Sequence, residues 1–178
     1  MAKVRFLEAK DMNPRGIQAL LAPFKPISNP DSRELVAVKH HPGEEGNSSY
    51  VSPELLGMIL EALELPGRRT YLTDTTVLYG GRRMTAPDYV FLAHSHGFAM
   101  PDFPPFIVAD GMTGTEEHVV TLPGECSTRY ARLAGALAKT GKAVMVSHFK
   151  GHLLAGFGGA IKHLGMGWAA KAGKLYQH

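Results

Sequence analysis

The chain has 178 residues, of which 44% are hydrophobic, and this suits one folded domain with a core of its own. Its 19 basic and 16 acidic residues are mixed along the sequence and give a formal charge of +3. No basic block with interleaved aromatic residues is present, so we expect no nucleic-acid partner. The sequence contains neither an apolar run of about 18 residues nor a signal-peptide core, and we therefore expect a soluble, cytoplasmic protein.

The cysteine content limits the cofactors that the chain can hold. Cys126 is the single cysteine, which excludes an intramolecular disulfide and an iron–sulfur cluster held only by thiolates of this chain. Because no base neighbours it in the sequence, we interpret Cys126 as structural. Any metal would be held mainly by histidines, carboxylates or a cofactor.

Strand-like and helix-like segments alternate along the chain. The expected strands are short apolar or alternating runs at residues 3–9, 34–40, 70–73, 105–109, 118–122 and 143–146. The expected helices have an apolar face or a capping signal and cover residues 14–21, 52–63, 86–94, 127–139 and 160–171. The first of these helices follows Asn13, a good N-cap, and begins with Pro14.

This alternation predicts right-handed βαβ units. We therefore predict a single α/β domain over residues 1–178, with a mostly parallel, Rossmann-like sheet and helices on both faces. Ligands of such sheets bind outside the carboxyl ends of the strands. Four expected strands end in ionisable groups that would meet at this edge: Lys39-His40-His41, Asp74, Asp110 and Ser147-His148.

Two histidines near the end of the chain are candidate metal ligands. His148 and His152 are four residues apart, so on a helix both rings would share a face and reach one metal. Gly151 lies between them and weakens a helix, and the glutamate of the zinc-protease signature is missing. Two polar residues lining a loop explain the pair equally well. His178 would add a third imidazole.

The run Gly156-Phe157-Gly158-Gly159 leads into the expected helix of residues 160–171. It lacks the spacing of the known phosphate loops, which disfavours a nucleoside triphosphate. Anion binding and close packing of the helix on the sheet are equal alternatives for the glycines. Lys162 lies in an apolar setting that would lower the pKa of its amine and make it nucleophilic, or it extends to solvent.

Polar residues in the middle of the chain are candidates for substrate binding and proton transfer. Asp74, Arg82 and Asp110 are the candidate substrate-binding residues, because an arginine in this basic turn would bind a carboxylate. His94 and His96 would transfer a proton. A surface turn and a polar helix end explain the same residues equally well.

Several motifs, in this order, resemble the domain of unknown function 362 (DUF362) family: TDTTVLYGGRR, AHSHGF, IVADG and HFKGHLLAGFGGAIKHLGMGWAAKAGK, followed by a final Gln-His. The resemblance runs from about Val36 to His178. One departure is His163, where the family more often has Asn. Members frequently continue into a ferredoxin-like segment with CxxCxxC motifs, and this chain stops before it. We therefore expect a short member or a separately encoded subunit with no iron–sulfur cluster of its own.

The same region is similar, more distantly, to the nickel-dependent lactate racemase group. In that group a histidine, a GF-x-GG-x-K run and a later histidine follow one another at the spacing of His152, Lys162 and His178. The similarity implies that Lys162 tethers a nickel-pincer nucleotide cofactor, that His178 ligates nickel and that His152 is an acid–base group. By position alone, His94 or His96 would be the second acid–base histidine.

The resemblances imply two functions of different classes. One is an enzyme-like domain that acts on a small carboxylate or hydroxy acid, with the tethered nickel cofactor or another divalent metal. The other is a non-catalytic accessory or electron-transfer domain that pairs with a ferredoxin-like iron–sulfur partner. The racemase group closes a second domain over its substrate, and 178 residues leave little room for one. In a homodimer, the second subunit would cover the substrate in place of that domain.

Overall fold

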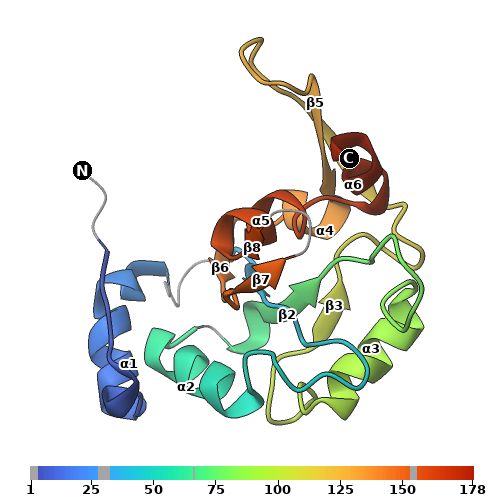
Figure 1. Ribbon diagram of the computed structural model, residues 1–178. Coiled ribbons are helices and arrows are strands. Elements are labelled where there is room, and N and C mark those ends of the chain that lie inside the picture. Colours follow the sequence, from blue (N-terminus) through green and yellow to red (C-terminus); the bar gives the residue numbers. More distant parts are fainter. Residues whose placement is uncertain (1–3, 28–32, 66, 153–155) are drawn as a thin grey trace.

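A four-stranded parallel sheet forms the centre of the protein in the computed structural model, which describes residues 4–27, 33–65, 67–152 and 156–178. The strands lie in the order β3-β2-β1-β6, and their bounds are Val36–Lys39 (β1), Thr70–Asp74 (β2), Phe106–Val108 (β3) and Lys142–Met145 (β6). In Figure 1 helices lie on both sides of this sheet. The predicted α/β architecture, with a parallel Rossmann-like sheet, is confirmed.

One face of the sheet carries the larger hydrophobic core. Val38 and Leu72 point to this face and pack against α2 (Pro53–Leu63) and α3 (Ala86–Ser95). The aromatic ring of Tyr89, on α3, is fully buried among them. This core holds the two long helices against the strands because burial of apolar surface is the main stabilising contribution to folding.

The opposite face carries a smaller core. Successive residues of a strand point to opposite faces, so Ala37 and Tyr71 lie on this side. They pack against Leu137 of the short helix α4 (Gly135–Ala138) and against Trp168. The C-terminal part of the chain therefore covers the face that α2 and α3 leave open.

The predicted helices at residues 14–21 and 52–63 are confirmed, and local capping explains both. The Asn13 side chain accepts hydrogen bonds from the amides of Arg15 and Gly16 at the start of α1 (Pro14–Leu21). Ser52 accepts a hydrogen bond from the Leu55 amide at the start of α2. Three 3₁₀ turns complete this half of the protein: η1 (Ala9–Asp11), η2 (Ala22–Ile27) and η3 (Gly67–Arg69).

The predicted strand at residues 3–9 is wrong over its described part. Residues 4–8 form no regular element, and η1 follows them. The side chains of Val4 and Phe6 are exposed by 91% and 85%. An apolar run forms a strand only where a partner strand accepts its backbone hydrogen bonds, and the described residues offer none here.

The predicted helix at residues 127–139 is mostly wrong. Its first part is β5 (Tyr130–Ala134), which pairs antiparallel with β4 (Glu117–Thr121), the predicted extra strand. The two form a hairpin that projects from the body of the protein in Figure 1. Only α4 is helical, because cross-strand pairing with β4 overrides the helix propensity of the alanines.

The predicted helix at residues 160–171 is interrupted. A hairpin of β7 (Lys150–His152) and β8 (Gly156–Gly158) precedes α5 (Ala160–Gly165), and α6 (Lys171–Gln177) begins after a break. The break is a tertiary effect, since the Ala134 amide donates to the Trp168 carbonyl and the Ala170 amide donates to Arg132. These contacts fix α6 beside the base of the projecting hairpin.

The order of the strands places a crevice at one edge of the sheet. β2 and β3 lie on one side of β1, whereas β6 lies on the other, so the order reverses between β1 and β6. Ligands of open α/β sheets bind outside the carboxyl ends of the strands at such a reversal. None of the helices in the described parts of the chain is long and apolar enough to span a membrane.

Candidate functional site

A cavity of about 310 Å³ opens at the carboxyl ends of the parallel strands. Lys39, the last residue of β1, and Asp74, the last residue of β2, line it from the sheet. Residues of β7, α5 and α6 line it from the C-terminal part of the chain, including Lys150, Lys162 and Lys174. The cavity therefore lies where the topology predicts a ligand site.

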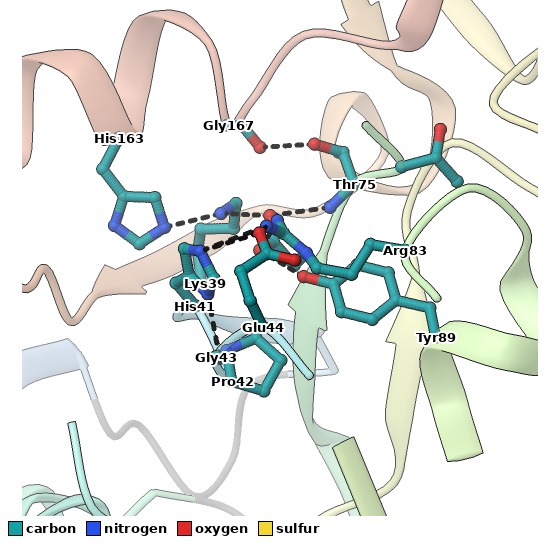
Figure 2. A network of polar contacts seen from close by, with 12 residues as sticks. Lys39, His41, Pro42, Gly43, Glu44, Thr75, Arg83, Tyr89, His163 and Gly167 are labelled. Atoms are coloured by element: carbon teal, nitrogen blue, oxygen red, sulfur yellow. Dashed lines mark hydrogen bonds and ion pairs between the residues drawn. The ribbon is translucent and has the colours of Figure 1, made fainter. Parts of the chain in front are cut away.

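Asp74 is the centre of a buried polar network, and Figure 2 labels its partners Lys39, Arg83 and Tyr89. One carboxylate oxygen lies 2.6 Å from Lys39 Nζ and accepts a hydrogen bond from the Thr75 amide at 2.7 Å. The other accepts from Arg83 at 3.0 Å and from the Tyr89 hydroxyl at 2.5 Å. Burial alone would raise the pKa of Asp74, but Lys39 and then Arg83 outweigh it and hold this pKa well below its usual range.

Lys39 also connects Asp74 to His163 on α5. Its Nζ lies 2.6 Å from His163 Nε2, and His163 Nδ1 lies 2.8 Å from the Ser147 hydroxyl. Burial, and then Lys39, lower the pKa of His163 to about 4, so this imidazole is neutral at neutral pH. An ammonium can only donate, so a protonated Lys39 fixes the tautomer with the proton on Nδ1, which donates to Ser147.

A glycine lets the backbone pass close to this lysine. A Cβ atom at Gly167 would lie 2.8 Å from Lys39 Nζ and 2.4 Å from the His163 carbonyl oxygen. The Gly167 carbonyl oxygen accepts a hydrogen bond from the Thr75 hydroxyl at 3.2 Å (Figure 2). The segment after α5 is thus fastened to the end of β2, and any larger residue at position 167 would push it away.

Arg83 extends the network to the loop that follows β1. Its guanidinium donates to the Glu44 carboxylate and to the Tyr79 hydroxyl, and it lies 3.1 Å from His41 Nε2. Burial, and then Arg83, lower the pKa of His41 to about 3. Burial raises the pKa of Tyr79 to about 12. His41 and Tyr79 are therefore uncharged at neutral pH. The negative charges of the network belong to the carboxylates of Asp74 and Glu44.

Three lysines of the cavity have no such partner. Across the described ranges, no carboxylate lies within ion-pair distance of Lys150, Lys162 or Lys174. Burial, and then Lys150, lower the pKa of Lys162. Burial lowers the pKa of Lys174 to about 8. The three lysines make the cavity wall cationic, and the amines of Lys162 and Lys174 lose protons more readily than that of free lysine.

The three histidines predicted near the chain end all line the same cavity: His148, His152 and His178. His152 lies on a β-strand rather than on a helix, so a shared helix face is not what brings it near His148. Some desolvation, followed by Lys162 and Lys150, lowers the pKa of His152. Over the described residues, no three or more side chains of His, Cys, Asp or Glu gather into a group that could hold a metal ion.

The remaining predicted site residues lie outside the cavity. Arg82 is exposed and pairs with Glu45 at 2.6 Å. His94 is exposed near the end of α3. His96 stacks on Tyr50 and lies 2.8 Å from the Pro42 carbonyl oxygen.

Asp110 is buried outside the cavity as well. It accepts hydrogen bonds from the Thr76 amide at 2.9 Å and from its hydroxyl at 2.7 Å. Asp110 thereby positions the turn after β2, and the carbonyl of Thr76 in that turn accepts a hydrogen bond from Lys174.

Sequence reasoning missed several residues of the cavity. In the sequence Lys39 is only part of a polar strand end, and nothing in the basic turn distinguishes Arg83 from Arg82. Nothing in the sequence singled out Lys174 from the other lysines of the tail. One available signal was the exit of β1, since a lysine that ends a buried strand must find a partner at the same edge.

A model of the domain of unknown function 362 (DUF362) family matches residues 36–178, which include every cavity residue named above. The chain belongs to this family. The family resemblance predicted from the motifs is therefore confirmed. No curated protein and no solved structure matches the chain. Because the DUF362 family is defined without a function, the chemistry of the cavity has to carry the functional argument.

Proposed function

We propose that this DUF362 domain binds a small carboxylate or hydroxy acid in the cavity and performs acid–base chemistry on it. The observation that carries the proposal is the group of three lysines without carboxylate partners, which face one cavity together with neutral imidazoles. A carboxylate ligand would supply the missing negative charge and accept hydrogen bonds from the ammonium groups.

The paired and unpaired cations have different roles in this proposal. Asp74 and Glu44 already neutralise Lys39 and Arg83, so these four side chains form a rigid wall. The sequence predicts that Arg82 binds the carboxylate of a substrate. In this proposal the lysines have that role, because Arg82 pairs with Glu45 outside the cavity.

His152 and Lys162 are the groups proposed to move protons. They come from β7 and α5 and line the same cavity. The pKa of each is lowered, so at neutral pH the His152 imidazole is neutral and can accept a proton from a bound hydroxy acid. The amine of Lys162 is a better nucleophile than that of an ordinary lysine.

The residues of the cavity also fit the cofactor that the racemase-like spacing implies. Lys162 supplies an amine for a covalent link, in which case Lys150 and Lys174 keep the charges that bind a carboxylate, and His178 on the same cavity supplies an imidazole ligand. A tethered nickel-pincer nucleotide would bring the other nickel ligands itself, which agrees with the lack of a three-residue metal group in the described chain. Such a cofactor, when bound, supplies a hydride acceptor for a hydroxy acid.

Intact mass and elemental analysis of protein from its native host would test the cofactor. We expect extra mass and nickel, both lost in Lys162→Ala and both kept in Lys171→Ala, whose amine bonds the Met84 carbonyl outside the cavity. A bare-chain mass without nickel would remove the cofactor from the proposal. Calorimetric titration with lactate tests carboxylate binding itself, and absence of binding at millimolar ligand would contradict the proposal.

One observation favours the second function, an accessory domain with a ferredoxin-like partner. Phe149 and Phe157, on the β7–β8 hairpin region, are exposed by 74% and 60%, and their ring centroids lie 5.7 Å apart. This apolar pair neighbours Lys150, so it suits an acidic partner surface. Titration of the ¹⁵N-labelled domain with a purified ferredoxin-like protein of the same organism would test it. Shifts confined to this hairpin, and lost in Phe157→Ser, are expected.

A further inference from the structure

The charged side chains of the cavity divide into a balanced group and an unbalanced one. Asp74 forms ion pairs with both Lys39 and Arg83, and Glu44 forms an ion pair with the other terminal nitrogen of Arg83. Two cations and two anions are thereby matched. Among the described residues, no carboxylate lies within ion-pair distance of Lys150, Lys162 or Lys174, so a ligand can pair with their charges.

The unbalanced lysines occupy two different places. Lys150 and Lys162 lie close to each other on either side of Gly158. A Cβ atom added at Gly158 would lie 3.9 Å from Lys150 Cγ and 3.5 Å from Lys162 Cδ. Lys174 lies at the turn after β2, where its Nζ donates to the Thr75 hydroxyl at 2.7 Å and to the Thr76 carbonyl. Lys150 is exposed, whereas the exposed fraction of Lys174 is 7%.

The position of Lys174 is built into the fold. It lies on α6, where a Cβ atom at Gly173 would lie 2.4 Å from the Arg132 carbonyl oxygen, so the helix approaches β5 closely only with glycine there. The ammonium has three protons, and Thr75 and Thr76 accept two of them. The third is left for a group in the cavity that Lys174 lines.

A buried ammonium without a counter-ion is unfavourable unless a ligand supplies one. Thr75 and Thr76 hold Lys174 at the turn after β2, whereas Lys150 and Lys162 come from β7 and α5. We propose that the ligand of this cavity carries two anionic groups, one bound by Lys174 and the other by Lys150 and Lys162. The inference rests on the proposed carboxylate-binding function and narrows the substrate class to hydroxy acids with a second carboxylate or a phosphate.

Calorimetric titrations of the full chain with three probes would test this. Lactate carries one anionic group, malate carries two carboxylates, and 3-phosphoglycerate carries a carboxylate and a phosphate. We expect at least one of the two larger probes to bind about tenfold or more tightly than lactate, since a second charge-assisted contact adds to the favourable free energy of binding. The tighter of the two identifies the second group as carboxylate or phosphate.

Variants locate the two anionic groups. Lys174→Met should reduce the affinity for the tighter probe about tenfold or more and leave lactate binding by the other lysines in place. Lys171→Met, on the same helix but bonded to the Met84 carbonyl, is the matched control and should change neither affinity. Thermal unfolding checks that each variant folds. If Lys174→Met does not fold, Lys150→Met tests the exposed end in the same way.

The outcomes separate this inference from the proposed function. Equal affinities for lactate, malate and 3-phosphoglycerate would overturn the two-anion ligand while the carboxylate-binding function stands. Failure of all three probes to bind would overturn both. A folded Lys174→Met that binds the tighter probe as well as the unchanged protein would overturn the place assigned to one anionic group.

Discussion

The cavity has two charged regions, one in which cations and carboxylates are paired and one in which lysines have no carboxylate within ion-pair distance among the described residues. Around Asp74 every charged group has a partner: Lys39 and Arg83 contact the carboxylate, and the Tyr89 hydroxyl completes the contacts. Lys174 donates two hydrogen bonds, and no carboxylate among the described residues lies within ion-pair distance of it. The difference indicates that the first region holds the strand ends together, whereas the second is where the proposed anionic ligand would bind.

The largest expected effect is on the paired region. Asp74→Asn should lower the free energy of unfolding by about 3–5 kcal/mol, because it leaves Lys39 buried without a counter-charge and Arg83 with Glu44 as its single carboxylate partner among the described residues. Urea unfolding followed by circular dichroism would measure it. The control is Glu45→Gln, which breaks the exposed pair with Arg82 and should change stability by about 0–1 kcal/mol. Similar losses in both variants would contradict the assignment of Asp74 as the structural centre.

A smaller loss is expected when only one contact of the network is removed. Tyr89→Phe deletes the buried hydroxyl that donates to Asp74 at 2.5 Å and should lower the free energy of unfolding by about 1.5–3 kcal/mol. Tyr50→Phe serves as a control, since the ring stacks on His96 and its hydroxyl has no hydrogen-bond partner in the described chain. A Tyr89→Phe protein as stable as the unchanged one would show that this hydrogen bond contributes nothing.

The unpaired region should respond in the opposite direction, and with pH. Burial lowers the folded-state pKa of Lys174 to about 8 from 10.5, despite Asp74 and Asp110, while Lys39 and Arg83 lower it further. Folding therefore disfavours the charged form of Lys174. This penalty is fully present below about pH 8, decreases as the pH rises and is absent above about pH 10.5. Without ligand, the Lys174→Met variant should have a higher melting temperature than the unchanged protein at pH 7. The difference between the two melting temperatures should decrease between pH 8 and 10.5. A constant difference across this range would contradict the charge penalty.

The smallest effect on stability is expected at the exposed end of the same region. Lys150→Met should change the free energy of unfolding by less than about 0.5 kcal/mol, because the side chain is exposed and has no carboxylate partner among the described residues. It should still weaken binding of a doubly charged ligand. Parallel melting and titration experiments would show the two effects separately, and a large loss of stability would assign Lys150 to the structural region instead.

The elements predicted most accurately are those with local signals. Asn13 and Ser52 cap α1 and α2 as expected from their side chains, and the strand at residues 70–73 is β2 with one added residue. The failures have tertiary causes. Residues 130–134 join β4 instead of a helix, and residues 166–170 leave the helix to contact β5 and Lys39.

The candidate site was predicted in part. The expectation that polar residues at the strand ends meet at one edge placed Asp74 in the cavity, and the C-terminal motifs placed His152, Lys162 and His178 there. Sequence proximity failed for Arg82, because neighbouring residues in a turn point in different directions and only Arg83 reaches Asp74.

The sequence by itself determined the alternation of strands and helices, the parallel sheet and the DUF362 family, because these depend on local periodicity, capping and motifs. Only the tertiary structure decided which charges are paired. Asp74 meets Lys39 across neighbouring strands, and Lys174 reaches Thr75 from a helix almost 100 residues later in the chain. Ion pairing depends on distance in space, and the folding of the C-terminal segment over the sheet edge sets that distance.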